Sequence, residues 1–204
     1  MRFLNAEIGK DTDRIFEYLR NVPKIDMIYN APPNPGSIKV WYKMAQNNNY
    51  IEYNRFLDNL FEIYKYIAPK TIAVEVLENR EIVLSRLNEW GFYKKTEIFP
   101  ITYTAPLRFN KPGMSYCRKP NGIVVCTNDK YLDLNFEFTY SHDFLNNFFI
   151  HNSSYTSSFD PCIGKGLLIR YCANTYGIEM NTDRFNEAVA THDLYWNTQQ
   201  STNN

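Results

Sequence analysis

Residues 158–166 read Ser-Phe-Asp-Pro-Cys-Ile-Gly-Lys-Gly, followed by Leu-Leu-Ile at 167–169 and Tyr-Gly-Ile-Glu-Met-Asn at 176–181. This pattern predicts a strand, a glycine-rich turn, a helix and a second strand that ends at Glu179. Gly164 and Gly166 permit a tight turn and a close approach of backbone to a ligand, because neither carries a Cβ. We expect the helix to point free N–H groups at the bound group, and Glu179 to accept hydrogen bonds from a ribose diol. The stretch predicts a nucleotide-binding unit, and the alternative is a plain turn that binds nothing.

The spacing differs from the dinucleotide fingerprint, which has three glycines in the pattern Gly-x-Gly-x-x-Gly. Here two glycines follow Asp-Pro, and Gly-Ile-Glu-x-Asn follows at 177–181. This arrangement resembles the S-adenosylmethionine site of the amino-methyltransferases, enzymes that methylate exocyclic amino groups of adenine or cytosine in DNA. The resemblance implies S-adenosyl-L-methionine as the cofactor. The cofactor-binding residues that it implies are Asp160, Pro161, Cys162, Gly164, Gly166, Glu179 and Met180.

The composition limits the class of protein. The chain has 204 residues, 44% of them hydrophobic, which suits one domain with a sizeable core. Its 22 basic and 22 acidic residues give no net charge, so contact with nucleic acid needs a local basic patch. The four cysteines and three histidines form no zinc pattern, and we expect no metal site and free thiols. With no apolar run long enough to span a membrane and no signal peptide, we expect a cytoplasmic protein.

The hydrophobic pattern predicts one domain over residues 1–196 and a polar, disordered tail over 197–204. Strands that alternate with helices indicate an α/β domain with a mostly parallel sheet. We expect strands at 2–8, 24–30, 71–76, 92–104, 123–126 and 131–140, and helices at 12–19, 50–67, 78–90, 141–152 and 182–192. Residues 37–49 are predicted to form a loop, and Asn121-Gly122 is typical of a hairpin turn.

A second motif extends the resemblance to almost the whole chain. Residues 25–34 read Ile-Asp-Met-Ile-Tyr-Asn-Ala-Pro-Pro-Asn. In amino-methyltransferases a similar strand leads into Asp/Asn/Ser-Pro-Pro-Tyr/Phe, and one subgroup carries this site first and the cofactor site last. The resemblance implies a single Rossmann-like class I methyltransferase domain, circularly permuted, with a seven-stranded sheet and helices on both faces. Glu7 and Asp11, near the end of the first strand, are further cofactor-binding candidates from their place in this order, and the sequence leaves open whether either contacts the adenine ring.

The motif departs from the family pattern at its two chemical positions. In the family its first residue accepts a hydrogen bond from the target amino group, and its aromatic residue stacks on the flipped-out base. Ala31 has no side-chain acceptor, and Asn34 has no ring. Asn30 is a substitute acceptor if the loop is displaced by one residue, and its replacement by Ala then abolishes activity while cofactor binding stays intact. Tyr29 or Trp41 is the substitute ring, and the catalytic candidates are Asn30, Ala31, Pro32, Pro33 and Asn34.

Residues 94–119 depart from electrical neutrality. They carry six basic residues against Glu97 alone, so 6 − 1 = +5, and they also contain aromatic residues. Basic residues interleaved with aromatic ones suit contact with phosphates and bases, although a solvated loop explains the pattern equally well. The nucleic-acid-binding candidates are Arg108, Lys111, Arg118 and Lys119.

Three hypotheses follow. The first is an S-adenosylmethionine-dependent methyltransferase acting on adenine N6 or cytosine N4, with DNA bound through a local basic patch. The second is a catalytically impaired protein of the same fold that binds the cofactor or a partner without methyl transfer. The third is the same chemistry on a non-DNA acceptor, such as a protein amide or a free nucleotide. The sequence leaves open the target base, the recognition sequence and whether the protein is a homodimer.

Overall fold

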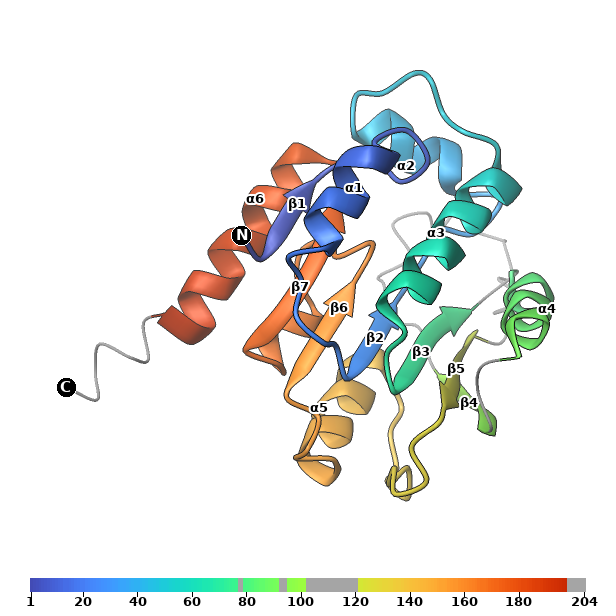
Figure 1. Ribbon diagram of the computed structural model, residues 1–204, viewed down its shortest axis with the longest axis vertical. Coiled ribbons are helices and arrows are strands. Elements are labelled where there is room, and N and C mark those ends of the chain that lie inside the picture. Colours follow the sequence, from blue (N-terminus) through green and yellow to red (C-terminus); the bar gives the residue numbers. More distant parts are fainter. Residues whose placement is uncertain (77–78, 92–94, 102–120, 198–204) are drawn as a thin grey trace, which may run out of the picture.

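The computed structural model describes residues 1–76, 79–91, 95–101 and 121–197. Seven strands of this part of the chain form one sheet in the order β1-β7-β6-β2-β3-β5-β4 (Figure 1). Neighbouring strands are parallel except that β5 runs antiparallel to β3 and to β4, so the predicted mostly parallel sheet is confirmed. The strands are β1 (Phe3–Asn5), β2 (Met27–Asn30), β3 (Thr71–Val76), β4 (Lys95–Ile101), β5 (Asn121–Thr127), β6 (Ser157–Asp160) and β7 (Asn174–Glu179).

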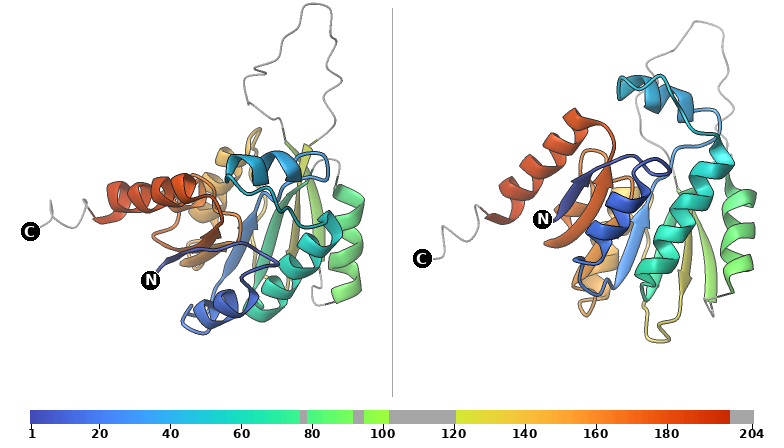
Figure 2. Two further views of the ribbon diagram at one scale, coloured as in Figure 1. Left: turned by 90° about the horizontal axis from the view of Figure 1, so that it is seen from above. Right: turned by 45° about the horizontal axis from the view of Figure 1, so that its top comes forward.

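Helices cover both faces of the sheet (Figures 1 and 2). One face packs against α1 (Thr12–Leu19), α3 (Tyr53–Ile67) and α4 (Arg80–Trp90). The other face packs against α5 (Ser141–His151) and α6 (Thr182–His192), which continues into a π-helical turn at Asp193–Asn197. The predicted helices on both faces are therefore confirmed.

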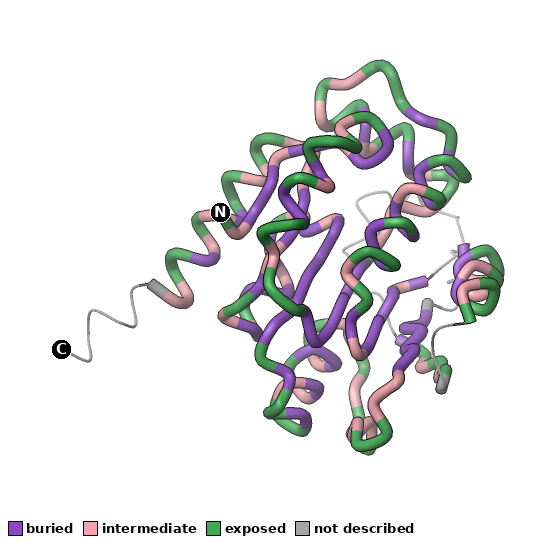
Figure 3. Tube along the Cα trace, in the orientation of Figure 1, coloured by how far each residue is buried: buried purple, intermediate pink, exposed green. Residues whose placement is uncertain are grey.

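The alternation of side chains along β2 determines which layer each residue joins. Ile28 belongs to the core beneath α3, whereas Met27 and Tyr29 belong to the core beneath α5. Successive side chains of a strand point to opposite faces, so a strand buried on both faces is apolar at nearly every position. The central strands are accordingly buried almost throughout, and the exposed side chains lie mainly on the helices and loops (Figure 3).

Local signals explain where the long helices begin and end. The side chain of Glu52 accepts hydrogen bonds from the backbone N–H groups of Asn54 and Arg55, which caps the start of α3. Gly91 ends α4 in the left-handed conformation, with φ of 61°, as its position predicts. The prediction for α6 (Thr182–His192) agrees with the structure at both ends, and its N-cap residue Asn181 accepts a hydrogen bond from the Arg184 N–H.

Two predicted features in the second half of the chain were wrong. Asn121-Gly122 is part of β5 and makes no hairpin turn, and Gly122 pairs with both Val76 and Pro100. A Cβ on Gly122 would lie 3.1 Å from the Phe99 carbonyl oxygen, so close packing between strands explains this glycine. Residues 131–140 form no strand, because their alternating apolar side chains pack against the core beneath α5 without a partner strand.

Two predictions for the first half of the chain were also wrong. Residues 37–49, expected to be a loop, contain the short helix α2 (Ile38–Met44). The first two strands are shorter than predicted, since β1 covers only Phe3–Asn5 and β2 begins at Met27. Of the tail predicted at 197–204, Asn197 belongs to the π-helical turn and residues 198–204 lie outside the described residues, so the division into one domain and a tail remains a prediction. None of the helices in the described ranges is both long and apolar enough to cross a membrane.

Candidate functional site

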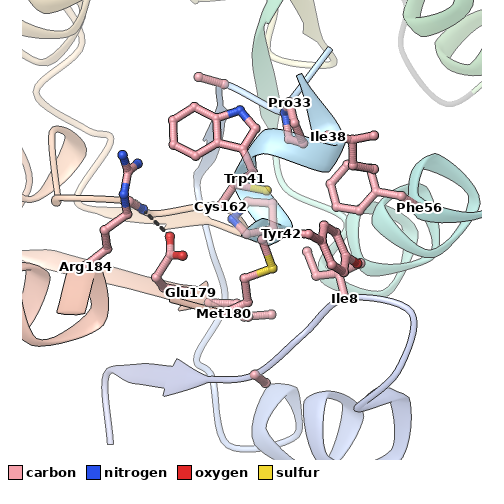
Figure 4. A pocket seen from close by; sticks show the side chains of 15 residues that line it. Ile8, Pro33, Ile38, Trp41, Tyr42, Phe56, Cys162, Glu179, Met180 and Arg184 are labelled. Atoms are coloured by element: carbon pink, nitrogen blue, oxygen red, sulfur yellow. Dashed lines mark hydrogen bonds between the residues drawn. The ribbon is translucent and has the colours of Figure 1, made fainter. Parts of the chain in front are cut away.

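A pocket lies at the carboxyl ends of the parallel strands, where open α/β sheets usually place their ligands (Figure 4). The space between its walls measures about 620 Å³, including volume that is open to solvent. Most of its wall is apolar. The lining residues are Ala6, Ile8, Ala31, Pro33, Ile38, Trp41, Tyr42, Phe56, Pro161, Cys162, Gly164, Ile178, Glu179, Met180 and Arg184.

The turn after β6 has the tight geometry that its glycines predict. Gly164 and Gly166 have φ values of 54° and 82°, a region that residues with a Cβ rarely adopt. The N–H of Ile163 donates to the carbonyl oxygen of Ile178 at 3.0 Å, which fastens the turn to β7. A Cβ on Gly166 would lie 2.6 Å from the Cδ1 of the buried Ile169 and 3.4 Å from the Cα of Ala188, so a side chain here would have to displace its neighbours.

The helix predicted after this turn is absent, and this expectation was wrong. Residues 168–170 form a single 3₁₀ turn, and β7 begins at Asn174. The short connection leaves too little chain for a helix of several turns. The backbone donors of a helix N-terminus are therefore not available here, and any ligand contact from this side comes from the turn itself.

Glu179, the last residue of β7, is directed into the pocket (Figure 4). Its Oε2 accepts a hydrogen bond from the Gly164 N–H at 2.9 Å, and its Oε1 accepts one from the Asn181 N–H at 2.8 Å. Burial raises the pKa of this carboxyl above its usual value, although the two N–H donors and the nearby Arg184 charge oppose the rise. The carboxylate thus holds the glycine turn and offers acceptors to a ligand.

Asp160, the last residue of β6, lies beneath the turn and is 5% exposed. Its Oδ1 accepts hydrogen bonds from the Cys162 N–H at 2.9 Å and from the Asn30 Nδ2 at 3.0 Å. Burial raises the pKa of Asp160 to about 7, and the charges of Glu179 and Glu75 add to the rise that the two donors oppose. Burial and the Asp160 charge also raise the pKa of the Cys162 thiol well above its usual value, so this thiol stays neutral.

Asn30 is fully buried between two partners. Its Nδ2 donates to Asp160, and its Oδ1 accepts a hydrogen bond from the Tyr64 hydroxyl at 2.8 Å. The structure therefore uses both ends of this amide to join β2, β6 and α3. That Asn30 accepts a hydrogen bond from a substrate stays a prediction, and its burial argues against that role.

The loop after β2 brings Ala31 and Pro33 into the pocket wall, next to the glycine turn. The amide of Asn34 points elsewhere, because its Oδ1 accepts a hydrogen bond from the Ser37 N–H at 3.0 Å in a local turn. Of the two substitute rings, Tyr29 is 2% exposed and its hydroxyl donates a hydrogen bond to the Glu75 carboxylate. Trp41 lines the pocket.

Helix α2 supplies the candidate ring Trp41 and two pocket residues that the sequence did not predict, Ile38 and Tyr42. Ile38, Trp41 and Tyr42 all face the pocket from this helix. Their spacing of three and four residues is that of one helical face, and this signal was present in the sequence. The guanidinium carbon of Arg184 lies 4.3 Å from the centre of the Trp41 ring, so α2 meets the start of α6 across the pocket mouth.

The two acidic candidates after β1 do not line the pocket, whereas Ala6 and Ile8 do. Glu7 forms an ion pair with Lys10 at 2.7 Å and accepts a hydrogen bond from the Asn47 amide at 2.6 Å. Asp11 accepts a hydrogen bond from the Glu7 N–H at 2.7 Å. Contact of either with an adenine ring is untested, and the geometry gives both carboxylates structural partners.

The basic candidates and the possible metal ligands remain to be placed. Arg108, Lys111, Arg118 and Lys119, which were predicted to bind nucleic acid, lie outside the described residues. Within the described ranges, no group of three histidine, cysteine, aspartate or glutamate side chains could hold a metal ion. The described cysteines, Cys126, Cys162 and Cys172, are free thiols.

No protein-family model matches the sequence, and no curated protein matches it either. The structure is similar to TTHA0409 of Thermus thermophilus, a candidate DNA modification methylase, with a TM-score of 0.61, 12% identity and 95% of each chain covered. TTHA0409 complexed with S-adenosyl-L-methionine matches with a TM-score of 0.58 at 14% identity, covering 96% of each chain. The M1.HpyAVI-SAM complex matches with a TM-score of 0.56 at 15% identity, covering 94% of this chain and 98% of that one. At these identities the likeness establishes the fold.

Proposed function

We propose that this protein is an S-adenosylmethionine-dependent DNA methyltransferase. One observation carries the proposal: the Asp160–Gly166 turn and the Ala31-Pro32-Pro33 loop, from opposite ends of the chain, meet at a single pocket. The resemblance assigns the first motif to the cofactor and the second to methyl transfer. Two of the similar structures were solved with S-adenosylmethionine, which agrees with this assignment.

The pocket residues suit the proposed cofactor. Glu179 has two acceptor oxygens for a ribose diol, and Ile178 and Met180 offer apolar surface to an adenine ring. Asp160 lies beneath the turn, behind the pocket lining, and the positive charge of a bound methionine moiety would favour the ionised form of this acid. When bound, the cofactor supplies a methyl group activated by its sulfonium centre.

The chain contributes to the reaction mainly by positioning the reactants. Ala31 and Pro33 line the pocket, Ala31 exposed and Pro33 half-buried, so an acceptor that reaches the pocket can meet this loop. A rigid Pro-Pro segment fixes the backbone and so restricts the line along which an amino nitrogen approaches the methyl group. The mainly apolar wall offers few partners to water in the same space.

The finer part of the proposal concerns the acceptor and the chain order. We propose an exocyclic amino group, adenine N6 or cytosine N4, because the loop at residues 30–34 resembles the amino-methyltransferase motif. We also propose that the chain is circularly permuted, since β6, the strand before the glycine turn, is sixth in the chain yet lies next to the central strand β2. DNA contact through Arg108, Lys111, Arg118 and Lys119, a homodimer and a cytoplasmic location remain part of this proposal.

Two other functions keep specific support. The amides of Asn30 and Asn34 are both engaged inside the protein, which favours a protein that binds the cofactor without methyl transfer. The absence of net charge favours a smaller acceptor than duplex DNA, because duplex binding usually draws on a basic surface.

Calorimetry followed by a transfer assay separates these functions. We expect the wild-type protein to bind S-adenosylmethionine and S-adenosylhomocysteine, and to move a labelled methyl group to unmethylated DNA. Binding without transfer to DNA, free nucleotides or protein would support the non-catalytic function. Transfer to nucleotides but not to DNA would support the third hypothesis, and no cofactor binding at all would refute the proposal.

A further inference from the structure

Glu75 is a carboxylate near the end of β3, beside the Ala31-Pro32-Pro33 loop, that no motif predicts and that is not among the residues lining the pocket. It is the penultimate residue of β3, and the β2–β3 register pairs Asn30 with Val74. Glu75 therefore lies one residue beyond the last residue of β2, beside the point where the chain turns into the Ala31-Pro32-Pro33 loop. Its negative charge adds to the raised pKa of Asp160, the buried acid beneath the glycine turn.

The Tyr29 hydroxyl holds this carboxylate by donating a hydrogen bond to its Oε1. Tyr29 and Ala73 are side by side in register and belong to the same core, so Glu75, two residues after Ala73, points to that face as well. Burial and the Glu75 charge raise the pKa of the Tyr29 hydroxyl, which therefore remains a donor. The half-buried Glu75 has no hydrogen-bond donor to its Oε2 in the described part of the chain.

Methylation of an amino group requires an acceptor for its protons. The nitrogen lone pair forms the new N–CH₃ bond while the S–CH₃ bond breaks, and the nitrogen must then release one proton. Ala31 has no side-chain acceptor, Asn30 is fully buried with both ends of its amide bonded, and Asp160 is buried beneath the turn. Among the described residues, the carboxylates of Glu75 and Asp160 each keep one oxygen that accepts no hydrogen bond, but Glu75 is half-buried whereas Asp160 is only 5% exposed.

We propose that Glu75 is a catalytic residue that accepts a hydrogen bond from the substrate amino group and takes its proton during methyl transfer. The released electron pair of the S–CH₃ bond stays on sulfur, giving S-adenosylhomocysteine, and the proton passes from the carboxylate to solvent. Tyr29 is the positioning residue that orients the carboxylate. This inference rests on the proposed function, and it assigns the acceptor role that the motif residue Ala31 lacks.

Two substitutions of Glu75 separate its ability to accept a hydrogen bond from its ability to take a proton. Glu75→Gln keeps an acceptor oxygen for Tyr29 and for the substrate but cannot take the proton. Glu75→Ala removes both abilities. We expect kcat to fall about 100-fold or more in Glu75→Gln, as for the loss of a general base, and to fall further in Glu75→Ala. Cofactor affinity by calorimetry and the thermal unfolding midpoint of Glu75→Gln should remain those of the wild type.

Asp129 provides a matched control. It also accepts a hydrogen bond from a tyrosine hydroxyl, that of Tyr155 at 3.1 Å, but at the opposite end of β3, where Tyr155 also contacts Thr71. Asp129→Asn should therefore leave kcat unchanged. A Glu75→Gln variant that folds, binds cofactor and methylates at the wild-type rate would overturn the inference and leave the proposed function standing. A wild-type protein that binds cofactor but methylates no acceptor would overturn both.

Discussion

The Glu179 carboxylate and the Gly164 backbone N–H form a hydrogen bond of 2.9 Å that joins the end of β7 to the glycine turn after β6. The same carboxylate accepts the Asn181 N–H, so one side chain fixes the turn, the strand end and the start of α6. A ligand that bonds to Glu179 therefore meets acceptors whose positions are already set, which lowers the entropy cost of binding.

We predict that Glu179→Ala reduces S-adenosylmethionine affinity at least ~30-fold, because hydrogen bonds to a charged group contribute about 1.5–3 kcal/mol each. Glu179→Gln should retain part of the affinity, since its amide oxygen still accepts the Gly164 N–H. Calorimetry with the cofactor and with S-adenosylhomocysteine measures both effects. Glu187→Ala, at an exposed ion pair with Lys165, is the control and should bind normally. Equal affinities in all variants would remove Glu179 from the site.

Asp160 predicts a dependence of stability on pH. Its pKa is raised from 3.8 to about 7 in the folded protein, so between these values the folded state holds a proton that the unfolded state has lost. The contribution is fully present below the unfolded pKa and is lost as pH rises through about 7, with a slope of up to about 1.4 kcal/mol per pH unit. Urea unfolding between pH 5 and 8 measures it.

Asp160→Asn is the control for this prediction, because its Oδ1 can still accept from the Cys162 N–H and from the Asn30 amide. The difference in free energy of unfolding between the two proteins removes contributions from other titrating groups. We expect the wild type to lose stability relative to Asp160→Asn as pH rises toward 7. A difference that is constant with pH would show that Asp160 has an ordinary pKa.

Asn30→Ala should act mainly on the fold and on cofactor binding. The substitution deprives Asp160 and the Tyr64 hydroxyl of a buried partner, at a cost of about 1–3 kcal/mol in the free energy of unfolding. Because Asp160 also holds the turn through Cys162, cofactor affinity should fall as well. This outcome differs from the expectation for a catalytic acceptor, which loses activity alone.

Chemical unfolding and calorimetry on the same Asn30→Ala protein decide between a structural and a catalytic role for Asn30. Asn34→Ala, which changes only a surface turn with Ser37, is the comparison and should cost less stability. If Asn30→Ala is as stable as the wild type, binds cofactor normally and transfers no methyl group, then Asn30 is the catalytic acceptor and our structural interpretation is wrong.

The sequence predicted the elements whose patterns are local and strong. β3 (Thr71–Val76) and α6 (Thr182–His192) have the predicted bounds, because a buried apolar run and a capped helical repeat are contained in the segment itself. The association of Asp160, Gly164 and Glu179 was also expected, since these residues lie on adjoining parts of one strand-turn-strand unit.

The features that the sequence did not predict depend on contacts between distant segments. α2 (Ile38–Met44) is too short to be stable alone, and the Asn181 amide bonds its last carbonyl oxygen, that of Met44, at 2.9 Å. The pairing of Tyr29 with Glu75 likewise depends on the register of β2 against β3. Apolar alternation at 131–140 predicted a strand that does not form, because the pattern records which side chains are buried and not which backbone they pair with.

The stacking of Arg184 on Trp41 gives the last prediction. The guanidinium lies 4.3 Å from the ring centre at the mouth of the pocket, and its charge lowers the pKa of Glu179 against the effect of burial. Cation–π contacts contribute about 0.5–2 kcal/mol, so each single substitution to Ala should weaken cofactor affinity about 3–30-fold. Removing both should cost less than the sum of the two single effects, because the pair acts as one unit.

A double-mutant cycle by calorimetry measures this coupling. Lys39 and Tyr50 provide the matched control, since Lys39 on α2 also lies over an aromatic ring, at 4.7 Å, but neither residue lines the pocket. Their substitution should leave cofactor affinity unchanged. Additive effects at Trp41 and Arg184 would mean that the two residues contact a ligand independently. Unchanged affinity in both single variants would mean instead that α2 does not form part of the binding site.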